Sequence, residues 1–93
     1  MTAAERLAAL GLVRASTGGG CEGAESETVA GLRVFATDGE AGFPVDEAGG
    51  LWVGVLSEEH DEPLWEAEGV EWDRLVAEAF AARAAFIGRG VRS

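Results

Sequence analysis

The chain has a single cysteine and lacks lysine altogether. These two features exclude several classes of protein. Cys21 is the one cysteine among 93 residues, so neither an internal disulfide nor a cysteine-rich zinc site is expected. All seven basic residues are arginines, against 17 acidic ones, which gives a formal net charge of −10. Proteins that bind phosphates need clustered Lys and Arg. We therefore expect no direct binding to nucleic acid and none to anionic membrane surfaces.

Long apolar runs are absent as well. The longest, Leu51 to Leu56, spans six positions and includes Gly54, whereas a transmembrane helix needs about 20 residues. The first residues contain Glu5 and lack the apolar stretch of a signal peptide. A length of 93 residues with 47% hydrophobic composition is enough for one small core. The expectation is one acidic cytoplasmic domain over residues 1–93, without a membrane segment.

The chain begins with a helix signal and continues into strand patterns. Thr2 and Glu5 have the spacing of a capping box, and Gly11 ends the short helix that this predicts. Alternation over 32–37 predicts a strand, followed by a tight turn at Asp38-Gly39. A short return strand is predicted over 43–45.

The strongest strand signal is the segment 51–56, apolar on both faces and therefore central. Residues 64–68 fit either another strand or a helical turn after Pro63. A longer helix follows, with an apolar stripe at Trp72, Leu75, Val76, Ala79, Phe80, Phe86 and Ile87. These elements predict an α+β fold: a mostly antiparallel sheet of four to five strands, a short N-terminal helix, and a longer C-terminal helix packed on one face.

A glycine cluster near the start matches a nucleotide-binding pattern in letters only. The segment Gly18–Gly23 reads G-x-G-x-x-G, and Asp38 follows 20 positions after Gly18. However, eight residues separate Gly23 from Leu32, too few for the helix and turn that precede the second strand of a dinucleotide-binding unit. The glycines are therefore interpreted as turns, and no nucleotide cofactor is expected.

The same cluster supports an alternative interpretation, a small ligand-binding domain or enzyme. A cysteine after glycines can be exposed beside backbone N–H groups, which favours a reactive thiolate. The acidic surroundings oppose that state and favour a small buried cysteine instead. One Cys, one His and scattered acids match no metal-ligand spacing, so we expect no metal. The residues of this alternative site are Gly19, Gly20, Cys21, Thr37, Asp38 and His60.

The second half of the chain carries a concentration of acidic residues. Nine acids and one arginine, Arg74, lie between Glu58 and Glu78, together with two tryptophans. Such a run is often only a solvated surface. Acids beside an aromatic anchor also suit docking on a basic partner surface, and Trp72 belongs to the helical stripe, which leaves Trp65 as the anchor. We predict a non-enzymatic protein-interaction module whose partner-binding residues are Glu58, Glu59, Asp61, Glu62, Trp65, Glu66 and Glu68.

The last residues reverse the sign of the charge. Arg83, Arg89 and Arg92 follow the final acid, Glu78. Cations near the C-terminus of a helix complement its dipole. They could also pair with the acidic region of a second copy, which would give a homodimer.

Four short motifs carry a resemblance to known sequences. They are Ser16–Cys21, Ala36–Gly39, Phe43-Pro44 and Val53–Leu56, and in this order they resemble a group of short proteins from actinobacteria and their phages. The resemblance covers Gly11 to Leu64. No activity is attached to that group, so it implies no catalytic residue. What it implies is a small accessory or inhibitor protein that acts on host machinery.

Overall fold

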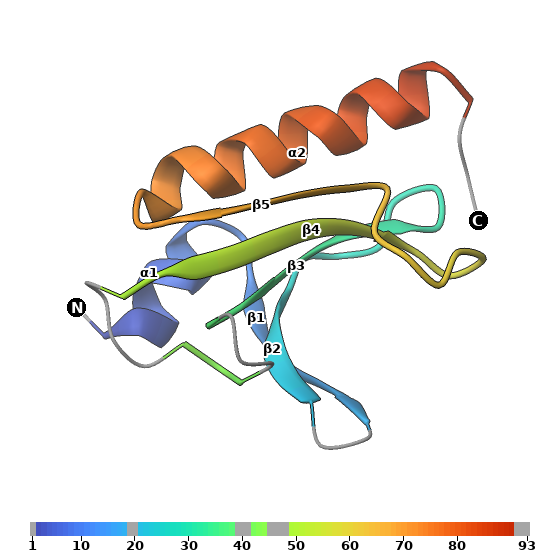
Figure 1. Cartoon of the computed structure of the whole chain (residues 1–93). Helices are drawn as coiled ribbons and strands as arrows, with labels where there is room; N and C mark the ends of the chain where they lie inside the picture. The colour runs from blue at the N-terminus through green and yellow to red at the C-terminus, as the bar shows by residue number, and fades with distance from the viewer. Residues whose placement is uncertain (1, 19–20, 39–41, 45–48, 91–93) are drawn as a thin grey trace.

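A five-stranded antiparallel sheet and two helices make up the protein, as the computed structural model shows (Figure 1). The structure describes residues 2–18, 21–38, 42–44 and 49–90. Each strand pairs with the next in the chain, so the sheet order is β1-β2-β3-β4-β5. The elements are α1 (Ala3–Ala9), β1 (Val13–Gly18), β2 (Cys21–Glu25), β3 (Leu32–Thr37), β4 (Leu51–Ser57), β5 (Trp65–Gly69) and α2 (Trp72–Gly88). The predicted α+β fold is confirmed.

The helix α1 begins with the predicted capping box. The backbone N–H of Glu5 donates to the Thr2 hydroxyl over 3.2 Å, and the Thr2 N–H donates to the Glu5 carboxylate over 3.0 Å. The backbone N–H of Thr2, and after it the Thr2 hydroxyl, hold the pKa of the Glu5 carboxyl group below its ordinary value. The helix ends at Ala9, and Gly11 follows with a φ of +92°, a left-handed conformation that glycine adopts without strain.

The strands confirm most of the predicted pattern and correct one part of it. The strands over 32–37 and 51–56 are present as β3 and β4, and the segment 64–68 forms strand β5 instead of a helical turn. The predicted return strand over 43–45 is not confirmed: Phe43 and Pro44 belong to no strand, and Val45 and Gly39 lie outside the described residues. Phe43 instead packs against the core, with the Arg14 guanidinium 4.7 Å from its ring centre.

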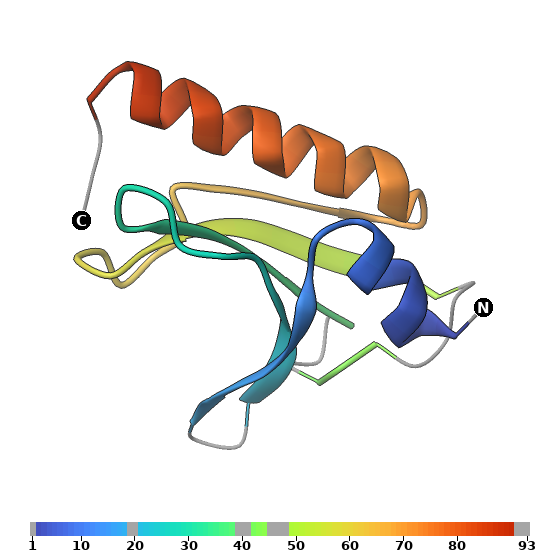
Figure 2. The ribbon, with the colours of Figure 1, turned by 180° about the vertical axis from the view of Figure 1, so that it is seen from behind.

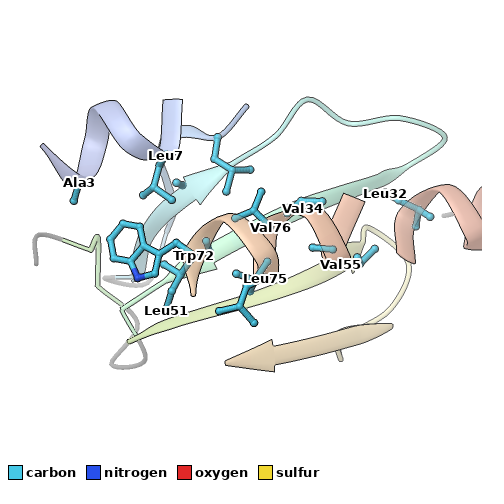
Figure 3. Close-up of a cluster of buried hydrophobic side chains, with 14 residues drawn as sticks. Ala3, Leu7, Leu32, Val34, Leu51, Val55, Trp72, Leu75 and Val76 are labelled. Carbon is cyan, nitrogen blue, oxygen red and sulfur yellow. The ribbon is translucent and has the colours of Figure 1, made fainter. Parts of the chain in front are cut away.

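The hydrophobic core lies between the sheet and the two helices (Figure 3). Helix α2 crosses over β3, β4 and β5, while the hairpin of β1 and β2 turns away from it (Figures 1 and 2). Trp72 is fully buried, as predicted, and its indole N–H donates to the Gly49 carbonyl over 2.8 Å. Other buried members are Leu7, Leu12, Leu32, Val34, Ala36, Leu51, Val53, Val55, Leu75, Val76 and Ala79.

Neither helix has the length and apolar character needed to cross a membrane, within the ranges that the structure describes.

Candidate protein-interaction surface

The register of β5 decides which of its side chains share a face. Residues opposite each other on antiparallel strands project to the same side of the sheet. Trp65 pairs with Val55 and Ala67 with Val53, so both face α2. Glu66 pairs with Gly54, and Glu68 pairs with Trp52 in the same register. Those two glutamates therefore lie on the opposite face, called here the open face because neither helix packs on it.

Six exposed acids continue from one end of β5 onto its open face. Four of them occupy the loop between β4 and β5, and Glu66 and Glu68 follow on the strand. We call this set the acidic strip: Glu58, Glu59, Asp61, Glu62, Glu66 and Glu68. Within the described part of the chain, no arginine forms an ion pair with any of them.

The arginines are engaged elsewhere. Arg74 lies 2.9 Å from the Glu78 carboxylate and 3.4 Å from that of Glu71, and these two partners raise the pKa of its guanidinium. Three further pairs join arginines of α1, β1 and β3 to other acids: Arg6 to Asp73, Arg14 to Glu22 and Arg33 to Glu25. The negative charge of the acidic strip is therefore not neutralised from within the described residues.

Trp65, the predicted aromatic anchor, lies on the other side of the sheet from Glu66 and Glu68. It is half-buried and packs against the core under α2. The tryptophan that shares the open face with these glutamates is Trp52, which is also half-buried. This role of Trp52 is not evident from the sequence, because the apolar run of β4 does not indicate which of its residues face the helix.

Glycine supplies the space in which the Trp52 ring lies. A Cβ atom placed on Gly54 would be 2.5 Å from Cη2 of Trp52, so the indole lies directly over this glycine. Phe35 lies in the same way over Gly23 of β2, with 2.7 Å between its Cζ and a Cβ placed there. A tryptophan two positions before a glycine in a strand is the sequence signal that could have indicated this packing.

A groove of about 420 Å³ lies on the other side of β5, against the first turns of α2. Its apolar lining includes Ala67, Leu75 and Val70, and the Val70 side chain is 66% exposed. Glu71, Arg74 and Glu78 form a rim on which the opposite charges are paired. Glu68 also lines this groove. The two sides of β5 still differ in chemistry: Glu66 and Glu68 project to the open face, whereas the groove beside the helix combines apolar side chains with paired charges.

The residues of the alternative reactive site are only partly described. Gly19, Gly20 and the side chain of Cys21 lie outside the described set, although Cys21 is the first residue of β2. Thr37 is buried at the end of β3. Asp38, directly after that strand, accepts a hydrogen bond from the Gly42 N–H over 3.0 Å.

His60 lies at the other end of β3 from Cys21. His60 comes three residues after Ser57, and Ser57 pairs with Leu32 at the start of β3. The Nδ1 atom of His60 is 3.0 Å from the Ser57 hydroxyl. Cys21 precedes Ala24, which pairs with Ala36 near the end of β3. Six residues of strand span roughly 17 Å, so the fold does not bring the imidazole next to this cysteine.

No group of three or more His, Cys, Asp and Glu suited to a metal ion occurs among the described residues. Comparison with known proteins adds no assignment: no family model, no curated protein and no solved structure matches the chain. The interpretation of the surface therefore depends on its own residues.

Proposed function

We propose that the protein is a non-enzymatic interaction module that binds a basic surface of a partner protein through the acidic strip. The observation that supports this most is the distribution of charge. Six exposed acids lie along one strand and the loop before it without an arginine partner among the described residues, while four of the arginines pair with other acids. Like charges held close together repel one another, and a complementary partner relieves that repulsion.

We favour a different protein over a second copy as the partner, because one of the arginines on which homodimerisation would depend is buried. Homodimerisation through the C-terminal arginines requires those guanidinium groups at the surface. Arg83 is 9% exposed and donates to the Ser26 hydroxyl and the Glu27 carbonyl. Arg89 is exposed and lies 4.9 Å from the ring centre of Phe86. Arg92 lies outside the described residues, and recovery of only the protein itself in the capture experiment below would favour a homodimer. The resemblance to actinobacterial and phage proteins favours a partner from the host's machinery.

The strip is expected to act mainly on the rate of association. A net charge of −10 attracts a basic surface over several ångströms at low salt. At about 0.1 M salt the screening length is about 10 Å, so attraction between exposed charges is strongly reduced. Binding through the strip must therefore weaken as salt rises.

The test is affinity capture from an actinobacterial lysate at low and at moderate salt. The wild-type protein is compared with a variant in which the loop acids are neutral, E58Q/E59Q/D61N/E62Q. One stoichiometric partner that is lost with salt and with the substitutions supports the proposal. Capture of the same partner by both proteins at both salt concentrations contradicts it. Thermal unfolding of the variant serves as the control for folding.

A further inference from the structure

Strand β5 has an unpaired edge. It is the last strand of the sheet, and in the described ranges no other strand pairs with its outer side. Alternate residues of an antiparallel edge strand direct their N–H and C=O groups away from the sheet, which makes such an edge a template for another strand. Folded proteins usually protect these edges with charged side chains, proline, a bulge or a covering loop, and in β5 the charged side chains are Glu66 and Glu68. The five residues Trp65–Gly69 contain no proline.

The glutamates of β5 disfavour pairing between two copies. If two β5 strands paired symmetrically about Ala67, Glu66 of each copy would lie opposite Glu68 of the other, on the same face. Like charges directly opposite each other destabilise a strand pair. A strand with basic residues at these positions would instead form two favourable pairs. The edge is therefore selective for a positively charged strand.

The two faces of the sheet beside β5 also favour different side chains at alternate positions of an added strand. Successive side chains of a strand alternate between the two faces of the sheet. Those on the open face would lie next to Glu66 and Glu68. Those on the helix side would enter the groove lined by Ala67, Val70 and Leu75. Carboxylates favour Lys or Arg, and the groove favours small apolar side chains.

We propose that an extended segment of the partner, with basic and apolar residues in alternation, pairs with the free edge of β5 as a sixth strand. This inference depends on the proposed function, because it states how the basic partner is held. Main-chain hydrogen bonds to β5 contribute affinity, and the alternation of side chains contributes specificity.

The first test uses synthetic peptides of equal composition. One peptide of about eight residues alternates Lys and Val, and its isomer carries the lysines and the valines in two blocks. Only the alternating peptide can place all of its lysines on the open face, where Glu66 and Glu68 lie, and all of its valines on the side of the groove. We expect it to bind at least about tenfold more tightly, which corresponds to about 1.4 kcal/mol.

The second test addresses the backbone directly. Two further peptides have the alternating sequence with N-methylated backbone amides. In one of them the methylated amides lie along one edge of the extended peptide, and in the other they lie along the opposite edge. Methylation of the edge that faces β5 must abolish binding, and methylation of the opposite edge must leave it largely intact. Amide hydrogen exchange of the protein, followed by NMR, must slow at alternate residues of β5 when the unmodified peptide binds.

A matched pair of protein variants tests the charge selection. E66Q/E68Q removes two negative charges from β5, and E22Q/E27Q removes two from β2 and the loop that follows it. We expect the first variant to bind the alternating peptide about tenfold less tightly, with less than about a twofold change for the second. Equal effects of the two variants overturn the selection by β5.

The outcomes separate this inference from the proposed function. Equal binding of both isomers, insensitive to N-methylation, overturns strand addition and leaves salt-dependent binding of basic partners in place. Failure of every basic peptide to bind at low salt overturns strand addition, and if no basic partner is captured from lysate either, the proposed function fails with it.

Discussion

Replacement of Gly23 by alanine should destabilise the protein by forcing a contact that cannot relax. A Cβ atom at this position would be 2.5 Å from the Ala36 carbonyl oxygen and 2.7 Å from Cζ of Phe35. The carbonyl belongs to the backbone of β3, whose pairing with β2 includes Ala24 and Ala36. It can retreat only if that pairing shifts. Overpacking of this kind costs about 1–3 kcal/mol, and replacing glycine returns about 0.4–1 kcal/mol through the unfolded state.

The net loss for G23A therefore lies between about 0 and 2.6 kcal/mol, and its midpoint of about 1.3 kcal/mol corresponds to roughly 5–10 °C in Tm for a domain of this size. Thermal and urea unfolding, followed by circular dichroism, measure it. Two other glycines provide controls. In G54A the three atoms nearest to the new methyl all belong to the outer end of the half-buried Trp52 ring, a side chain that can shift without moving the backbone, and we expect a smaller loss than for G23A. In G88A it meets nothing within 4 Å, and helix propensity predicts equal or higher stability. A G23A protein as stable as G88A would refute the reasoning.

Three further predictions concern the helices and the cysteine. R83A removes a buried guanidinium that donates to the hydroxyl of Ser26, and should lower the free energy of unfolding by about 2–3 kcal/mol in urea titrations; a loss below about 0.5 kcal/mol would contradict this. T2A should cost about 1 kcal/mol at pH 7. The Thr2 hydroxyl, which T2A removes, is one of the groups that lower the pKa of Glu5, so the stability that this contact adds is present above the unfolded pKa and is lost as pH falls through the folded one. The difference between T2A and wild type should therefore shrink in acid, and an increase would contradict it. Cys21 should be alkylated by iodoacetamide only after unfolding, by mass spectrometry, whereas rapid native alkylation would favour the alternative reactive site.

The sequence predicted the elements that carry strong periodicity. The alternation over 32–37 and the apolar run over 51–56 identified β3 and β4, and the capping box identified the start of α1. The strands β1 and β2 were not foreseen individually. Their residues are mostly small or polar, and few of them are buried, Ala24 being one. Because a hairpin that turns away from the core buries few side chains, its sequence shows little periodic alternation of apolar and polar residues.

The candidate site could be predicted in composition but not in geometry. The exposure of the loop acids follows from their charge, and the structure agrees. Which tryptophan shares a face with Glu66 and Glu68 depends on strand register, because a shift of one residue moves every side chain to the opposite face. Trp65 was therefore chosen where Trp52 lies next to the glutamates. The groove beside α2 depends on tertiary packing and has no local sequence signal.

The central claim is that the acidic strip attracts a basic partner. It is tested most directly by the association rate with the captured partner, measured by stopped flow from low to physiological salt for wild type and for E58Q/E59Q/D61N/E62Q. The account predicts that the wild-type rate falls about tenfold or more across this range and that the variant associates more slowly with a flatter salt dependence. Association that is indifferent both to salt and to these substitutions would contradict it.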